Sequence, residues 1–307
     1  MPMPSTSEQA RALEQTAGAR FVDDLRVVFL TGDDQRAWLN GQVTNDVRNT
    51  EKGQAVYGLA VTVKGRIMAD VWALDLGERL AITVPADAQE SVLASFESQI
   101  IMEDVELEPT DLQVLSVQGP RCAEVVQTLP ADLAEHTCKA AELDQPGRFV
   151  LVKPAQRTRI ETLLGPALTA VGGLEIDPGG WELARLRARR PRFGSDFGMA
   201  TYPQEAGLKD RAVSFNKGCY LGQEVVCTLE SRGRLARRLC ALAAHDELTS
   251  DLPLCAAGAE VGRVTSAALD PEHNTWLALG FVKQAHTAAD TVLESNAGSV
   301  RVVSPIS

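Results

Sequence analysis

The chain has 307 residues, of which 45% are hydrophobic and 23% charged, and its formal net charge is −11. These are ordinary globular values, and the length allows two or three domains, because single cores stop growing near roughly 250–300 residues. The acidic balance argues against general affinity for nucleic acid, which requires a basic surface. The arginine-rich runs at 185–192 and 232–238 are either solvated faces or part of a locally basic cleft for a small anion.

Nothing in the sequence is typical of membrane targeting or of a metal site. Residues 1–18 lack the apolar segment of a signal peptide, and no apolar run approaches the roughly 18–20 residues of a membrane span. We therefore expect a cytoplasmic protein without a membrane partner. The six cysteines are scattered without a Cys-x-x-Cys pair and the four histidines are isolated, so neither disulfides nor a metal site are predicted.

In chain order, two similar units of strand, glycine and helix appear. Segment 25–30 is predicted as a strand that ends at Gly32, before a helix that reaches Leu39 with Gly41 as its stop. Segment 112–117 repeats this pattern, with a turn at Gly119 and a helix over 121–129. Further strands are expected at 56–61, 67–74, 80–84, 105–107 and 149–152, and further helices at 86–101, 160–171 and 181–189.

After residue 234 the pattern changes to short β-rich segments separated by turn residues. They lie at 239–243, 262–267, 276–281 and 300–303, and few helical patterns remain. This is typical of a small antiparallel barrel. The sequence therefore predicts a first α/β lobe over 20–111, a second over 112–234 and a C-terminal barrel over 235–307.

The most informative segment is the octapeptide KGCYLGQE at 217–224. It places Cys219 next to the cation of Lys217 and ahead of a predicted helix start, an environment that favours a thiolate. Cys219 is then a nucleophile, a redox centre or a transient metal ligand; the alternative is a small buried side chain in a glycine-bounded turn. No histidine is close in sequence, which argues against a protease-type mechanism. Cys227 is either a resolving partner or part of a packed helix face.

Other polar residues have two interpretations each. Gln223 and Glu224 fall in the first helical turn, where they either contact a ligand or contribute to a capping box. Glu205 lies in a loop with proline and glycine, where it either accepts N–H donors of a heterocycle or is exposed. The basic turns at 64–66 and 232–233 either bind a carboxylate or phosphate or are solvated.

Several of these motifs together resemble one family. The octapeptide is similar to the Lys-Gly-Cys-Tyr-x-Gly-Gln-Glu signature of the YgfZ-type folate-binding proteins, relatives of the glycine-cleavage T-protein, an aminomethyltransferase. The supporting segments occur in order along nearly the whole chain. They are LNGQVTNDV at 39–47, KGRIMAD at 64–70, PQE at 203–205, RG at 232–233 and VGRVTS at 261–266.

The resemblance implies an α+β fold, a T-protein-like three-domain cloverleaf in which two mixed α/β lobes and a C-terminal antiparallel β-barrel surround a tetrahydrofolate pocket. It also implies an accessory role in the assembly or repair of iron–sulfur clusters, with folate and client enzymes or cluster carrier proteins as partners of an expected monomer. Cys219 is then the key reactive residue and Glu205 the pterin ligand. The other residues expected to bind the cofactor are Lys217, Tyr220, Gln223, Glu224 and Arg237. Arg232 is the alternative to Arg237 as the arginine that contacts the folate.

The chain departs from the family pattern in two places. Cys227-Thr228 stands where family members often have Ala-Arg, so a cation is missing there. The T-protein's catalytic aspartate is expected after the strand at 80–84, and residues 85–88 offer no clear match. Folate-dependent aminomethyl transfer is therefore the alternative function, and a purely structural binding module is a third. Whether any reaction is catalysed stays open.

Overall fold

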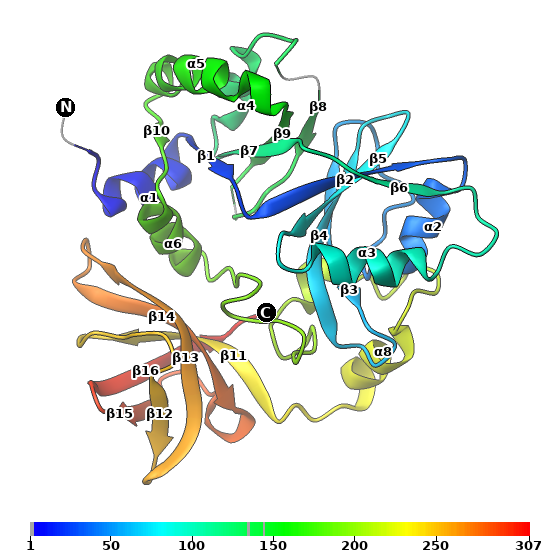
Figure 1. The fold of residues 1–307 in the computed structure, drawn as a ribbon. Helices are drawn as coiled ribbons and strands as arrows, with labels where there is room; N and C mark the ends of the chain where they lie inside the picture. Colours follow the sequence, from blue (N-terminus) through cyan, green and yellow to red (C-terminus); the bar gives the residue numbers. More distant parts are fainter. Residues whose placement is uncertain (1–2, 134–135, 144) are drawn as a thin grey trace.

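The computed structural model describes residues 3–307 except 134, 135 and 144. Within these residues the chain forms two five-stranded sheets flanked by helices and a closed six-stranded barrel (Figure 1). The predicted α+β architecture of two mixed lobes and a C-terminal barrel is therefore confirmed. No helix of the described residues is long and apolar enough to cross a membrane.

The first sheet is antiparallel, in the order β3-β4-β5-β2-β6. Its β3–β4 hairpin turns at Gly65, whose φ of 69° suits glycine. Trp38 and Phe96, from two helices, pack edge to face in the core on one side of the sheet. The elements are β2 (Leu25–Thr31), α2 (Gln35–Gln42), β3 (Ala55–Val61), β4 (Ile67–Asp75), β5 (Leu80–Pro85), α3 (Gln89–Glu97) and β6 (Glu106–Pro109).

The predicted end of the helix at Leu39 is wrong. Helix α2 continues through Gly41 to Gln42 and its C-terminal cap is Val43. A Cβ at Gly41 would meet no atom within 4 Å, so this glycine does not mark a crowded turn. A glycine in a helical pattern is only a weak stop signal.

The second sheet has the order β10-β1-β7-β9-β8. Strand β1 pairs antiparallel with β7 from Gly18↔Gln118 to Val22↔Val114, although the next strand along the chain, β2, belongs to the first sheet. A buried cluster that includes Leu74 and Phe149 joins the two sheets. The domain boundaries expected above stay a proposal. The elements are β1 (Gly18–Val22), β7 (Gln113–Gln118), α4 (Cys122–Gln127), β8 (His136–Lys139), β9 (Gly147–Val152), the 3-10 turn η1 (Pro154–Gln156), α5 (Arg157–Ala170) and β10 (Leu174–Glu175).

The barrel closes in the order β11-β14-β13-β12-β15-β16 around a core of small and branched apolar side chains. Helix α6 connects it to the lobes, because Arg185 of α6 forms a fully buried ion pair with Asp196 at 2.7 Å and also donates to Ser266 of β13. The remaining elements are α1 (Thr6–Gln15), α6 (Pro178–Arg187), α7 (Lys209–Ala212), α8 (Gln223–Arg232), β11 (Arg237–Ala244), β12 (Pro253–Ala256), β13 (Ala259–Asp270), β14 (Thr275–Lys283), η2 (Gln284–His286), β15 (Val292–Ser295) and β16 (Gly298–Pro305).

Candidate ligand-binding site

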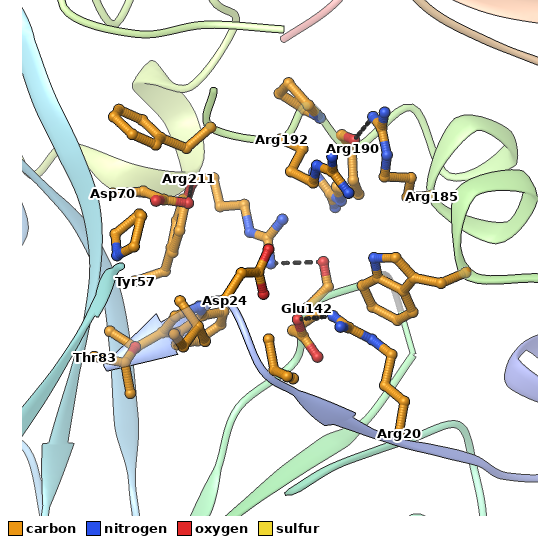
Figure 2. Close-up of a pocket in the computed structure, with 17 residues that line it drawn as sticks. Arg20, Asp24, Tyr57, Asp70, Thr83, Glu142, Arg185, Arg190, Arg192 and Arg211 are labelled. Atoms are coloured by element: carbon orange, nitrogen blue, oxygen red, sulfur yellow. Dashed lines mark hydrogen bonds and ion pairs between the residues drawn. The ribbon is translucent and has the colours of Figure 1, made fainter. Parts of the chain in front are cut away.

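A cavity of about 140 Å³ lies between the two lobes (Figure 2). This is roughly ten times the volume that one water molecule needs. Its walls come from both sheets, from α6 and the segment after it, and from α7. The lining residues are Arg20, Val22, Asp24, Leu25, Tyr57, Asp70, Trp72, Thr83, Pro85, Glu142, Trp181, Arg185, Arg190, Pro191, Arg192, Phe193 and Arg211.

One wall of the cavity is a row of side chains across the first sheet. Tyr57 of β3 is opposite Trp72 of β4, and Trp72 is opposite Thr83 of β5. Side chains that face each other across neighbouring strands lie on the same face of a sheet, so these three share the cavity face. The rings of Tyr57 and Trp72 are 5.1 Å apart. Asp70 joins them, because it is two residues before Trp72 on the same strand.

Asp70 is the acid of this wall. Its carboxylate accepts a hydrogen bond of 3.0 Å from the Tyr57 hydroxyl. Burial raises the pKa of Asp70 to about 6, although the Tyr57 hydrogen bond and the nearby Arg211 guanidinium act in the opposite direction. Burial also raises the pKa of Tyr57, so the phenol stays a donor. A carboxyl group with a pKa near 6 can accept an N–H or exchange a proton near neutral pH.

The facing wall carries arginines (Figure 2). Arg20 forms an ion pair of 2.8 Å with Glu142, and its guanidinium lies 3.8 Å from the centre of the Trp181 ring. Arg211 bridges the two walls, because it donates to the carbonyl oxygen of Glu142 at 3.0 Å while its guanidinium lies 4.9 Å from the centre of the Tyr57 ring and 5.8 Å from that of Trp72. Arg192 is exposed, and its Nε donates to the Ser195 hydroxyl at 3.2 Å.

The two walls differ in chemistry in a way that selects a ligand class. Aromatic rings and a half-buried carboxyl group on one side suit a flat heterocycle with N–H donors. Guanidinium groups on the other side suit carboxylates, which they bind in a forked geometry. The cavity therefore fits a molecule with a planar ring at one end and an anionic group at the other.

The signature octapeptide lies elsewhere, against the end of α2. Lys217 is 7% exposed, and its ammonium donates to the carbonyl oxygens of Asn40, Val43 and Asn45, each at 2.6 Å. Burial lowers the pKa of Lys217 to about 8. An ammonium group has three N–H donors, so these carbonyls use all of them. Two of the sequence motifs, 39–47 and 217–224, are thus joined by this lysine.

Helix α8 begins at the end of the octapeptide. Its N-cap is Gly222, with φ of 78°, and a Cβ there would lie 2.3 Å from the Thr62 carbonyl oxygen. The β3–β4 hairpin that contains motif 64–70 therefore packs directly against the start of α8. The capping box considered for Gln223 and Glu224 is absent, because a glycine N-cap has no side chain to accept a bond.

Cys219 is exposed, whereas Cys122, Cys138 and Cys240 are buried. The alternative of a small buried side chain is therefore wrong for Cys219. Tyr220, the next residue, is buried, its ring centre is 5.2 Å from Lys217 Nζ, and burial raises its pKa.

Glu205 and Arg237 meet at the junction between the first lobe and the barrel. Glu205 is 3.7 Å from Arg237 of β11 and 3.9 Å from Arg66 of the β3–β4 hairpin. Its backbone carbonyl accepts a bond of 2.7 Å from the Leu239 amide. These two predicted residues are thus brought together.

None of the site residues predicted from the sequence is among the residues that line the cavity. Arg232 ends α8, and its side chain lies outside the described part of the structure. The predicted ligand roles of the other residues stay predictions. Sequence reasoning missed Tyr57, Asp70, Thr83 and Trp181, although Asp70 ends a motif that had been singled out. Burial alternates along the first six residues of β4 and puts Asp70 on the less buried face, but the mainly apolar residue types of this strand do not reveal that alternation.

The comparisons with known proteins agree with this architecture of two lobes and a barrel. Residues 3–145 match the GCVT N-terminal domain, and residues 237–305 match the glycine cleavage T-protein C-terminal barrel domain. The fold resembles the crystal structure of the glycine cleavage system aminomethyltransferase T from Bartonella henselae, with a TM-score of 0.84, 19% identity, and coverage of 98% of this chain and 88% of that one.

Together the two domain matches cover more than half of the chain, which therefore belongs to the glycine cleavage T-protein family. An aminomethyltransferase of Desulfitobacterium hafniense is 27% identical over 96% of this chain and 88% of its own length. A tRNA-modifying protein YgfZ of Vibrio vulnificus is also 27% identical, over 71% of this chain and 67% of its own length. The resemblance to the YgfZ-type relatives of the T-protein is confirmed.

Proposed function

We propose that the protein binds tetrahydrofolate in the cavity between the lobes and serves as an accessory protein in the assembly or repair of iron–sulfur clusters of client enzymes. Cys219 is the reactive thiol in this proposal. The observation that carries the folate part is the opposition of an aromatic wall with Asp70 to a wall of arginines. A pterin ring and a glutamate tail match these two walls in turn.

The residues of the cavity have separate roles in binding. Tyr57 and Trp72 hold the flat ring, and Asp70 orients it by accepting ring N–H donors. Arg192 attracts the carboxylates of the tail, while Arg211, over the Tyr57 and Trp72 rings, lies at the ring end. Tetrahydrofolate supplies the capacity to carry a one-carbon unit when it is bound. The protein's own groups bind it, orient it and hold a proton at the Asp70 carboxyl.

The role of Cys219 is supported by its exposure and by the relatives that include YgfZ proteins. An exposed thiol can meet a partner protein, which a thiol inside the cavity could not do. The client enzymes, the cluster carriers and the cytoplasmic location belong to the same proposal.

The test of folate binding is calorimetric titration with tetrahydrofolate of the wild type and of two acid variants. If the cavity is the site, Asp70→Asn weakens binding about tenfold or more, because charge-assisted hydrogen bonds contribute roughly 1.5–3 kcal/mol. Glu205→Ala is the matched comparison. Loss of binding in Glu205→Ala with full binding in Asp70→Asn would move the pterin to the lobe–barrel junction and refute the cavity site.

The test of the cluster role uses cells that lack the protein. Cys219→Ala is expected to fail to restore the activity of cluster-dependent enzymes, while Cys255→Ala, a change of a half-buried thiol in the barrel, restores it. Full rescue by Cys219→Ala would remove the thiol from the mechanism and favour a structural binding module.

One observation favours the alternative, folate-dependent aminomethyl transfer. Asp70 supplies a carboxyl group with a pKa of about 6 inside the cavity, where such a reaction needs an acid. From the sequence this acid is expected after the strand at 80–84, where residues 85–88 offer no clear match, and Asp70 lies on the preceding strand. Formation of methylenetetrahydrofolate and ammonia from tetrahydrofolate and an aminomethylated lipoyl protein, with release of the lipoyl thiol, would establish this activity, and its absence would eliminate it.

A further inference from the structure

Thr83 has a buried hydroxyl group without a partner. The residue lies on β5, is 1% exposed and lines the cavity. No hydrogen-bond donor or acceptor among the described residues reaches its Oγ1. A buried hydroxyl without a hydrogen bond destabilises the folded state. A valine of nearly the same shape would fill this place without that penalty.

The position of Thr83 explains what its hydroxyl can meet. Trp72 is directly opposite on β4, and Asp70 is the diagonal neighbour on the same face. Diagonal neighbours on adjacent strands are about 7–8 Å apart. Asp70 and Thr83 thus lie at separate places on the wall that also carries Tyr57 (Figure 2), and a flat ring against this wall has the carboxyl group at one edge and the hydroxyl at another.

We propose that Thr83 determines ligand specificity by hydrogen-bonding the ring of the bound molecule from the edge opposite Asp70. The hydroxyl both donates and accepts, so it pairs with a ring carbonyl, a ring nitrogen or an N–H. The ligand class is a planar heterocycle with polar atoms on two edges. That this heterocycle is the pterin of tetrahydrofolate rests on the proposed function.

Two measurements on Thr83→Val and Thr83→Ser test the inference. In calorimetric titration with tetrahydrofolate, Thr83→Val weakens binding by about 2- to 13-fold, as expected for one neutral hydrogen bond, and Thr83→Ser keeps wild-type affinity. In thermal unfolding without ligand, Thr83→Val has a higher midpoint than wild type, because the unpaired hydroxyl is gone. A hydroxyl with a purely structural role would give a lower midpoint instead.

The outcomes separate this inference from the proposed function. If wild type binds tetrahydrofolate and Thr83→Val binds it equally well, the Thr83 inference is overturned while the folate function stands. If wild type does not bind tetrahydrofolate, the folate function is overturned. The thermal unfolding midpoint without ligand then tests the Thr83 inference. A higher midpoint in Thr83→Val supports a hydroxyl that binds a different heterocycle, and a lower midpoint refutes the inference.

Discussion

Replacement of Lys217 by methionine distinguishes a structural role from a ligand role for the central lysine of the signature. Methionine keeps an unbranched side chain but removes the ammonium group that donates to the carbonyl oxygens of Asn40, Val43 and Asn45. These carbonyls end α2 and begin the segment that follows it. We therefore expect Lys217→Met to loosen the contact between motifs 39–47 and 217–224.

The magnitude follows from the three hydrogen bonds. A hydrogen bond to a charged group contributes about 1.5–3 kcal/mol, and the loss of three such bonds is partly offset because a buried ammonium no longer has to be desolvated. The expected decrease in the free energy of unfolding is about 2–4 kcal/mol, which lies at the upper end for single substitutions. The melting midpoint should fall by roughly 3–6 °C, because an unfolding entropy of about 2.1 cal/mol/K per residue makes each kcal/mol worth about 1.6 °C in a chain of 307 residues.

The assay is urea unfolding followed by circular dichroism, with tetrahydrofolate titration of the same preparations. Lys64→Met is the control, since Lys64 is an exposed lysine in the β3–β4 turn and its replacement should change stability by less than about 0.5 kcal/mol. A Lys217→Met protein as stable as wild type would refute the structural role. Weaker tetrahydrofolate binding without a loss of stability would instead make Lys217 a ligand contact.

Two further predictions concern titratable groups. Because the pKa of Asp70 is raised from 3.8 to about 6 in the folded state, the folded protein holds this proton more tightly, and the stability contributed by Asp70 falls as pH rises from about 4 to 6. The free energy of unfolding of Asp70→Asn, relative to that of wild type, should therefore be about 1–3 kcal/mol higher at pH 7 than at pH 4. A relative free energy of unfolding that does not change with pH would contradict the pKa shift. Cys219 should react with iodoacetamide faster than the buried Cys138 and Cys240, because burial raises the pKa of those two thiols to about 12. The extent of labelling is measured by peptide mass spectrometry. Equal labelling of the three cysteines would show that exposure does not control the reaction.

The octapeptide shows which features of the protein a sequence motif predicts and which it does not. Its residue types and spacing predicted the family and a helix start near Gln223, both of which are confirmed. Lys217 was expected to favour the Cys219 thiolate or to bind the cofactor, which stays a prediction, and the structure adds that its ammonium donates to carbonyl oxygens at the end of α2. A motif is compatible with either role, because the sequence does not say which distant backbone carbonyls a lysine will meet.

Sequence by itself determined most of the longer elements and the separation of two mixed lobes from a barrel, because alternation, turn residues and glycines act locally. It did not predict β1, which pairs with β7 and β10 far along the chain. Tertiary structure alone decided where the cavity lies. Tyr57, Asp70 and Thr83 come from three successive strands whose register puts them on one face, and the packing of the chain brings Arg211, from a segment much later in the sequence, to the same cavity. A carboxyl group such as Asp70 becomes a candidate functional acid only when burial and its neighbours shift its pKa, and those neighbours are set by the fold.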